Sequence, residues 1–128
     1  MNQTFDVILV GAGIMGCATA LELSRRGLSV AVVEKGALAS GSTGKSSAIV
    51  RQHYSNEVTA RMARWGLDVF RDFDERVGGP CGFVNAGFLV LVPAGDAEGL
   101  RANVALQQAV DVNTRILSPE EIRDVLPG

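Results

Sequence analysis

Two apolar runs flank an amphipathic segment at the start of the chain. Residues 5–10 (FDVILV) and 28–33 (LSVAVV) are rich in β-branched side chains, which predicts two strands buried on both faces. Residues 14–26 carry apolar side chains at helical spacing and basic ones in the last turn, and Gly27 follows as a C-cap. Strand, helix and strand at this spacing predict a right-handed βαβ unit with parallel strands.

A long helix is predicted after a polar loop. Residues 36–47 are small and polar, as in a loop, and residues 56–77 have a helical period that ends at residues 78–80, Gly-Gly-Pro. One face of this helix is apolar, and we expect it to pack in the core. That face consists of Val58, Met62, Trp65, Val69 and Phe73.

The last third of the chain is predicted to mix strands and helices. Residues 83–84 and 88–92 have strand character and are separated by Asn85-Ala86-Gly87, which predicts a hairpin or bulged turn. Residues 96–110 predict an amphipathic helix, and residues 115–117 predict a short strand.

A capping pattern marks a final helix. Ser118 stands where an N-cap is expected, and Pro119 follows at the first helical position. Glu121 stands three residues after Ser118, where its side chain can close a capping box. This pattern predicts that the last helix begins at Pro119.

Composition and charge narrow the class of protein. The chain has 128 residues, of which 47% are hydrophobic and 20% charged, as in a soluble globular protein. Its net charge of −2 gives no electrostatic reason to bind nucleic acid or an anionic membrane. No segment approaches the ~20 apolar residues of a membrane span. The apolar start lacks a preceding basic region and is interrupted by glycines, so no export signal is predicted.

The two cysteines indicate neither a disulfide framework nor a metal site. Cys17 and Cys81 lack the spacing of metal ligands or of a redox motif. We expect both to be small buried residues in a reducing compartment. Together with the missing export signal, this predicts a cytoplasmic protein without a metal.

A glycine-rich turn lies between the first strand and the first helix. Residues 11–16, GAGIMG, have the GxGxxG pattern. Gly11 allows the tight turn, Gly13 lets a pyrophosphate approach the backbone, and Gly16 lets the helix pack close to the strand. The amides and positive dipole end of the helix, which starts at Ile14 and Met15, then face the phosphates.

An acid follows at the end of the second strand. Glu34 stands eighteen residues after Gly16, where a carboxylate accepts hydrogen bonds from a ribose diol. The ordered series of strand, glycines, helix, strand and acid predicts an adenine dinucleotide site. Glu34 suits the free ribose of either NAD or FAD, so these residues leave the choice between the two open.

Gly44-Lys45-Ser46 resembles the end of a Walker A loop. That motif is GxxxxGK[ST] and starts directly after a strand. Here its first glycine would fall at Ala39, and the second predicted strand ends near Val33. ATP binding at Lys45 is therefore not predicted.

Three stretches together resemble the FAD-dependent amine and amino-acid oxidoreductases. These are Glu34-Lys35-Gly36, then residues 39–44 (ASGSTG), then residues 48–51 (AIVR). Residues 85–91 and 117–127 also look like this family, whose members include sarcosine oxidase, glycine oxidase, dimethylglycine dehydrogenase and D-amino-acid oxidase. The resemblance covers almost the whole chain and is greatest to the sarcosine oxidase and dimethylglycine dehydrogenase branch.

The resemblance implies a fold and a set of cofactor contacts. It implies an α/β chain with the Rossmann-like FAD-binding βαβ start of a glutathione-reductase or D-amino-acid-oxidase type fold. The FAD-binding part would cover residues 1–80, and residues 81–128 would begin the substrate-binding domain. FAD would be bound noncovalently, with its adenosine ribose on Glu34 and its adenine near Lys35. The isoalloxazine would lie above Ser47, Ala48 and Ile49. The residues implied to contact the pyrophosphate or its surroundings are Gly11, Gly13, Ile14, Met15, Gly16, Ser42 and Thr43.

The resemblance also assigns a substrate contact. Arg51 matches the arginine that pairs with the substrate carboxylate in sarcosine oxidases, and a guanidinium fork suits a carboxylate. Some relatives attach flavin covalently to a histidine of this loop, but that position falls near Lys45 here, which implies a noncovalent flavin. His53 is expected to be a packing or surface histidine.

The predicted activity is oxidation of the C–N bond of a secondary or tertiary amine of amino-acid type. Hydride equivalents would pass to the flavin, and water would hydrolyse the imine. Two alternatives stay open, namely an NAD-dependent dehydrogenase and a noncatalytic dinucleotide-binding subunit. The family members are longer, so we expect an N-terminal fragment or one piece of a split enzyme. Alone it should bind FAD weakly and turn over no amine without the remaining part or other subunits.

Overall fold

The computed structural model describes residues 3–126, and the chain divides into two compact units. The first unit is Met1–Ile49 and the second is Val50–Gly128. The predicted boundary at residue 80 concerns the domains of a complete protein, and this division into units does not test it. Within residues 3–126, no helix has both the length and the apolar character needed to cross a bilayer.

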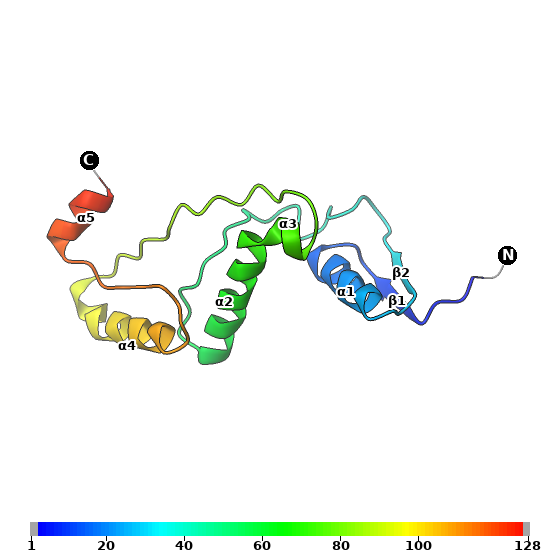
Figure 1. Cartoon of the computed structure of the whole chain (residues 1–128). Helices are drawn as coiled ribbons and strands as arrows, with labels where there is room; N and C mark the ends of the chain where they lie inside the picture. Colours follow the sequence, from blue (N-terminus) through cyan, green and yellow to red (C-terminus); the bar gives the residue numbers. More distant parts are fainter. Residues whose placement is uncertain (1–2, 127–128) are drawn as a thin grey trace. The chain divides into compact units, whose positions relative to one another are not determined.

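A βαβ motif forms most of the first unit. The strands β1 and β2 are parallel, with Val7 opposite Val30 and Val10 opposite Val33. The helix α1 connects the two strands and lies beside them (Figure 1). The predicted α/β class and the parallel βαβ start are thereby confirmed. The bounds are β1 (Val7–Val10), α1 (Ile14–Arg25) and β2 (Val30–Val33).

Gly27 ends the helix of this motif, and hydrogen bonds between Asp6 and Ser29 join the segments that precede its two strands. Gly27 follows the helix with φ = 83°, a left-handed conformation that favours glycine, so the predicted glycine stop is confirmed. Before the strands begin, the carboxylate of Asp6 accepts hydrogen bonds from the backbone N–H of Ser29 at 2.8 Å and from its hydroxyl at 2.7 Å. These bonds, the hydroxyl's first, lower the pKa of Asp6.

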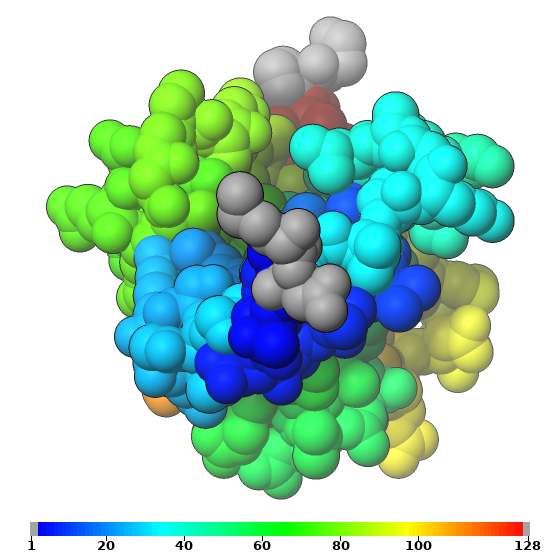
Figure 2. Space-filling view, turned by 90° about the vertical axis from the view of Figure 1, so that its right-hand side faces the viewer, coloured from blue at the N-terminus to red at the C-terminus, as the bar shows by residue number. Residues whose placement is uncertain are grey.

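The strands are not buried on both faces, contrary to the prediction. Ile8 is 63% exposed and Val10 is 89% exposed, whereas Val7 and Leu9 are half-buried. Among the described residues only α1 covers this strand pair, so side chains that alternate to the other face meet solvent. In Figure 2 the cyan residues of the following loop form a lobe beside the blue strand and helix.

The second unit is helical around a small core. Ala60, Val110 and Val112 are buried together, and Tyr54 and Leu106 pack against them. The helix predicted over residues 56–77 is interrupted at Asp72, whose φ of −104° and ψ of 29° leave the helical range. The bounds are α2 (Glu57–Arg71), α3 (Phe73–Arg76), the 3₁₀ helix η1 (Ala94–Asp96), α4 (Ala97–Gln108) and α5 (Pro119–Val125).

The apolar face of α2 was expected in the core but is largely exposed. Val58, Met62 and Trp65 are each about two-thirds exposed, at 64%, 67% and 64%. The helix instead buries Ala60 and Leu67. The other two residues of the predicted stripe, Val69 and Phe73, are half-buried, and the Phe73 ring stacks on that of Phe70.

Two further expectations are wrong. Cys17 and Cys81 are free thiols, and both are exposed rather than buried. The strands predicted over residues 83–84, 88–92 and 115–117 are absent, and these residues belong to no sheet. A strand needs a neighbour for its N–H and C=O groups, and none of the described residues supplies one there.

The predicted capping box of the last helix is confirmed. The Ser118 hydroxyl accepts from the Glu121 N–H at 3.3 Å, and the Glu121 carboxylate accepts from the Ser118 N–H at 2.7 Å. Pro119 occupies the first helical position, as predicted.

Candidate dinucleotide site

Gly11 makes the turn between β1 and α1. Its φ is 103°, a left-handed conformation that L side chains rarely adopt. Its N–H donates to the Val33 carbonyl at 2.7 Å, which ties the turn to the end of β2. No other atom lies within 4 Å of the position a Cβ would take, so the space beside the turn is open.

Gly16 lets α1 approach this turn. A Cβ on Gly16 would lie 1.9 Å from the Gly11 carbonyl oxygen, which is far inside van der Waals contact. Helix and turn can therefore be this close only with glycine at position 16. This is the close-packing role that the sequence pattern predicts for its third glycine.

Thr43 lies at the start of α1. Its hydroxyl accepts a hydrogen bond from the Ile14 N–H at 3.0 Å, and its Oγ1 lies 3.0 Å from where a Cβ on Gly13 would be. Gly13 is the N-cap and has no side chain with which to cap the helix. The Thr43 hydroxyl thus accepts from one of the backbone N–H groups that have no partner within the helix, although Thr43 and Ile14 are 29 residues apart in sequence.

Glu34 binds the backbone of the same turn. Its Oε2 accepts from the Ala12 N–H at 2.9 Å and its Oε1 from the Gly36 N–H at 2.8 Å. The Ala12 bond is the largest cause of a lowered pKa of Glu34, and the Gly36 bond is the next. The carboxylate is therefore held ionised at neutral pH beside the turn. A carboxylate has about four acceptor positions, so these two bonds leave capacity for a ribose diol.

The loop after β2 folds back on the turn. The Ala39 N–H donates to the Ala12 carbonyl at 3.0 Å, and the Gly44 N–H donates to the Ala39 carbonyl at 2.7 Å. Ala39 and Ala48 have φ values of 58° and 53°, in the left-handed region that is costly for alanine. Strained residues of this kind gather at binding sites, and here they belong to the loop that carries Thr43.

The remaining predicted cofactor residues of this unit are open to solvent. Ile14, Met15 and Ile49 are exposed apolar side chains, at 57%, 78% and 68%. Lys35, Ser42, Ser47 and Ala48 are also exposed. The structure thus brings Gly11, Gly13, Ile14, Gly16, Glu34 and Thr43 together, and it leaves the other positions around them accessible.

The geometry of the turn fits an anionic dinucleotide. The first turn of α1 contains no acidic residue to repel a phosphate. The space beside Gly11 is open, and the Thr43 hydroxyl lies at the start of α1. The Glu34 carboxylate, at the end of β2, is held by its hydrogen bond from the Ala12 N–H. These are the groups that a diphosphate and a ribose require.

The Walker-like segment lacks the geometry of a P-loop. Gly44 lies eleven residues beyond the end of β2 at Val33, and the next helix begins at Glu57. A Cβ on Gly44 would lie 2.5 Å from the Ala39 carbonyl oxygen, so this glycine permits a tight loop. Lys45 therefore stands in a loop that is not joined directly to a strand and a helix.

Arg51 belongs to the second unit and lies close to Tyr54. Its guanidinium carbon lies 5.4 Å from the centroid of the Tyr54 ring, within the range of a cation–π contact. The Arg51 side chain is exposed, whereas Tyr54 is half-buried against the small core. An exposed guanidinium on a partly fixed ring is able to meet an anion from solvent.

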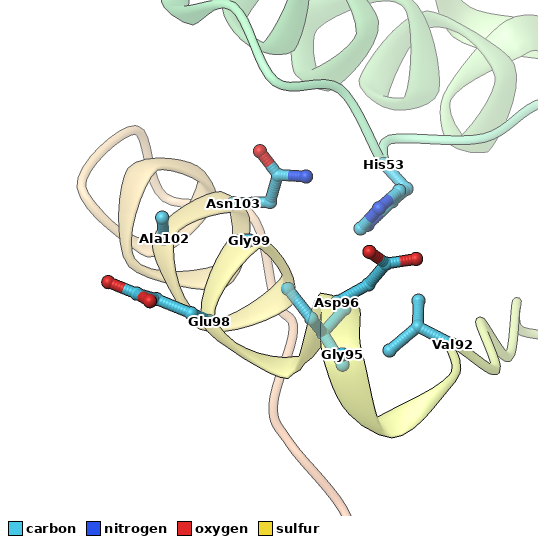
Figure 3. A pocket seen from close by; sticks show the side chains of 9 residues that line it. His53, Val92, Gly95, Asp96, Glu98, Gly99, Ala102 and Asn103 are labelled. Carbon is cyan, nitrogen blue, oxygen red and sulfur yellow. The ribbon is translucent and has the colours of Figure 1, made fainter.

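A groove of about 570 Å³ lies in the second unit between His53 and one side of α4. Its other lining residues include Val92, Asp96, Glu98 and Asn103. Figure 3 shows the His53 imidazole and the Asp96 carboxylate directed toward each other across it. The expectation that His53 is a packing or surface residue did not include this groove.

Sequence reasoning missed Gln107. This side chain is buried, with 1% of its surface exposed, and it hydrogen-bonds to His53 and Tyr54. No local signal marks it, because a glutamine on an amphipathic helix is ordinarily solvated and its partners lie more than fifty residues away.

Comparison with known proteins identifies the family of the chain. The sequence profile of the DAO family, described as FAD dependent oxidoreductase, matches residues 6–128. The chain is 30% identical to sarcosine oxidase subunit beta of Rhodobacter capsulatus over 98% of this chain and 31% of that protein. It is 26% identical to the mitochondrial pyruvate dehydrogenase phosphatase regulatory subunit of Mus musculus over 95% of this chain and 14% of that protein.

A solved structure has the same fold. The crystal structure of L-proline dehydrogenase from P. horikoshii matches 99% of this chain and 34% of its own chain, with a TM-score of 0.80 and 24% identity. The chain thus spans about a third or less of the length of these relatives. The predicted resemblance is confirmed, and the cofactor of this family is FAD, as expected. The chain belongs to the DAO family of FAD-dependent oxidoreductases.

Proposed function

We propose that the chain forms the FAD-binding N-terminal part of an enzyme that oxidises the C–N bond of a secondary or tertiary amine of amino-acid type. The observation that carries the cofactor assignment is the gathering of Gly11, Thr43 and Glu34 at the start of α1. Support for the amine comes from the likeness to a sarcosine oxidase subunit. The same likeness supports further segments or subunits as partners.

Each group at the turn has a role in holding FAD. Between Gly11 and Ile14, the N–H groups of Gly11, Ala12 and Ile14 already donate to protein acceptors. The Gly13 N–H and the Thr43 hydroxyl would therefore bind the diphosphate, and Glu34 would accept from the adenosine ribose. When bound, FAD would supply the acceptor for a hydride, which carries the two electrons that the substrate loses. The exposed Ser47, Ala48 and Ile49 would run along the flavin, which they can approach because two of them are small.

Arg51 would bind the carboxylate of the substrate. Its guanidinium can donate two parallel hydrogen bonds, and the Tyr54 ring limits its freedom. Holding the carboxylate orients the amine end of the molecule, so this contact would contribute orientation rather than proton transfer.

Substitution of Arg51 tests the substrate assignment. In the complete flavoprotein, Arg51→Lys keeps the charge but loses the planar fork, so KM for sarcosine should rise about tenfold or more. The flavin spectrum and the FAD dissociation constant should stay unchanged. Arg101→Lys, the same change at an exposed position on α4, serves as the control and should leave KM unaltered.

Three outcomes would contradict the proposal. An unchanged KM for Arg51→Lys would remove Arg51 from the substrate site. Oxidation of an alcohol but of no amine would refute the substrate class. A protein that transfers hydride to NAD and carries no flavin would support the dehydrogenase alternative.

A noncatalytic role is the second candidate. It is favoured by the likeness to a protein named as a regulatory subunit. Such a subunit would use the same turn to bind a dinucleotide but would oxidise no amine. Flavin that stays oxidised in the complete protein when amines of amino-acid type are added under anaerobic conditions would support this role.

A further inference from the structure

Gln107 is the one buried polar side chain among residues 3–126. It lies on the last turn of α4, and its amide nitrogen Nε2 lies within hydrogen-bonding distance of two atoms. One is the Tyr54 carbonyl oxygen at 3.1 Å, and the other is Nδ1 of His53, also at 3.1 Å. A single buried amide therefore joins α4 to the segment that precedes α2.

The Tyr54 carbonyl decides which way this amide faces. A backbone carbonyl can only accept a hydrogen bond, so the NH₂ group of Gln107 must face it. A flipped amide would place two oxygens against each other in a buried position, which is costly. The orientation of Gln107 is thus fixed by the backbone rather than by the imidazole.

That orientation fixes the tautomer of His53. The amide nitrogen can only donate, so Nδ1 must be the acceptor in this contact. In a neutral imidazole the proton then lies on Nε2. The groove beside the ring contains the Asp96 carboxylate, which faces the imidazole and suits an N–H donor (Figure 3).

The same two bonds hold the segment that carries Arg51. Arg51 lies two residues before His53, and its guanidinium is 5.4 Å from the centroid of the Tyr54 ring. Tyr54 is anchored twice, because its ring packs against the buried cluster and its carbonyl accepts from Gln107. Without the Gln107 amide, the Tyr54 carbonyl would lose its hydrogen bond, and only the packing of the Tyr54 ring would hold this segment.

We propose that Gln107 is a positioning residue that fixes His53 as its Nε2–H tautomer and holds the Arg51–Tyr54 segment for carboxylate binding. The carboxylate part rests on the proposed function, whereas the tautomer does not. The two parts therefore need separate readouts.

The tautomer is read by ¹⁵N NMR of the imidazole. His53 is the single histidine of these 128 residues, and the loss of its ring nitrogen resonances in a His53→Gln variant assigns them in the complete flavoprotein. In neutral wild-type protein, Nδ1 should resonate as a nonprotonated nitrogen and Nε2 as a protonated one. Two averaged resonances, as in free imidazole, would overturn the proposal.

Two substitutions change the amide without removing its bulk. Gln107→Glu replaces the donor by an acceptor and should move the proton of His53 to Nδ1. Gln107→Met removes both hydrogen bonds at similar volume, so the tautomers should then interconvert and average. Gln108→Glu is the matched control, because Gln108 is exposed and donates to Thr114 instead. Unchanged His53 resonances in both Gln107 variants would overturn the proposal, even if one of them folds poorly.

Enzyme kinetics test the positioning part in the complete flavoprotein. Gln107→Met should raise KM for the carboxylate-bearing amine about threefold or more, while kcat and the flavin spectrum stay near their wild-type values and Gln108→Glu changes neither. An unchanged KM beside an altered tautomer would overturn the positioning role. If Arg51→Lys also left KM unchanged, the failure would lie in the proposed function rather than in Gln107.

Discussion

Gly16 is the residue at which the first unit has no room for a side chain. The position of its missing Cβ lies 1.9 Å from the Gly11 carbonyl oxygen, which is backbone and cannot rotate away. Any larger residue must push α1 off the turn. The start of α1 would then move away from Thr43, whose hydroxyl serves the Ile14 N–H.

Gly16→Ala should therefore destabilise the first unit and weaken FAD binding. The cost of overpacking is about 1–3 kcal/mol, and urea unfolding measures it. Gly66→Ala is the control, since Gly66 lies inside α2 with open space around its missing Cβ. That change should be neutral or stabilising by up to ~1 kcal/mol. Equal effects at both positions would contradict the close packing of α1 on the turn.

Because of Glu34, the stability of the first unit should depend on pH. Its pKa is lowered from an ordinary value of 4.5, because its charged form accepts from Ala12 and Gly36. A lowered folded-state pKa contributes stability above pH 4.5, and this contribution is lost as pH falls through the folded value. Glu34→Gln cannot titrate and offers one acceptor oxygen instead of two.

The unfolding free energy of wild type should therefore exceed that of Glu34→Gln at pH 7, and the difference should shrink below pH 4.5. Chemical denaturation of both proteins between pH 3 and pH 7 gives this difference directly. Asp6, whose pKa is also lowered, is present in both proteins and cancels. A difference that stays constant over this range would show that the Glu34 bonds do not form.

The helix α5 shows what a capping sequence does for a short element. It has 7 residues, none of them buried, so its ends matter more than its packing. Ser118 and Glu121 satisfy each other's backbone N–H groups, and Arg115 adds an ion pair to Glu121 at 2.9 Å.

Ser118→Ala should unravel the start of this helix. Loss of an N-cap costs about 1 kcal/mol, which is large for an exposed helix of this length. Amide hydrogen exchange of residues 120–125 should become faster, whereas Ser118→Asp keeps an acceptor and should preserve the wild-type rates. Unchanged exchange in Ser118→Ala would mean that other contacts hold the helix.

Elements whose partners are local could be predicted from the sequence. The motif β1–α1–β2 and the capping of α5 follow from residues a few positions apart, and both match the structure. The strands expected over residues 83–92 did not form, because no described segment pairs with them. Of the five residues of the apolar stripe predicted over residues 56–77, Val58, Met62 and Trp65 are exposed, whereas Val69 and Phe73 are half-buried. Periodicity indicates which face is apolar and not what covers it.

The candidate site shows the same division between local and distant contacts. The glycine pattern and Glu34 could be found from spacing, since a GxGxxG turn and an acid one strand later form a known arrangement. The hydrogen bond between Thr43 and Ile14 could not be predicted from residue spacing, because the loop that carries Thr43 has no regular period. Gln107 was missed because its partners lie more than fifty residues away.

At the scale of the whole molecule, the chain is two compact units within a family of much longer proteins. Its relatives are about three times as long or longer, and the profile of the family matches nearly all of the chain. In the described residues, apolar side chains of β1 and α2 such as Ile8, Val10 and Trp65 are exposed.

The central claim is that FAD lies with its diphosphate at the start of α1. The most direct test is a crystal structure of the complete flavoprotein with FAD bound. The diphosphate oxygens should lie within hydrogen-bonding distance of the Gly13 N–H and the Thr43 hydroxyl, and the adenosine ribose should contact Glu34. A diphosphate bound elsewhere, or a turn closed by protein side chains, would contradict the account.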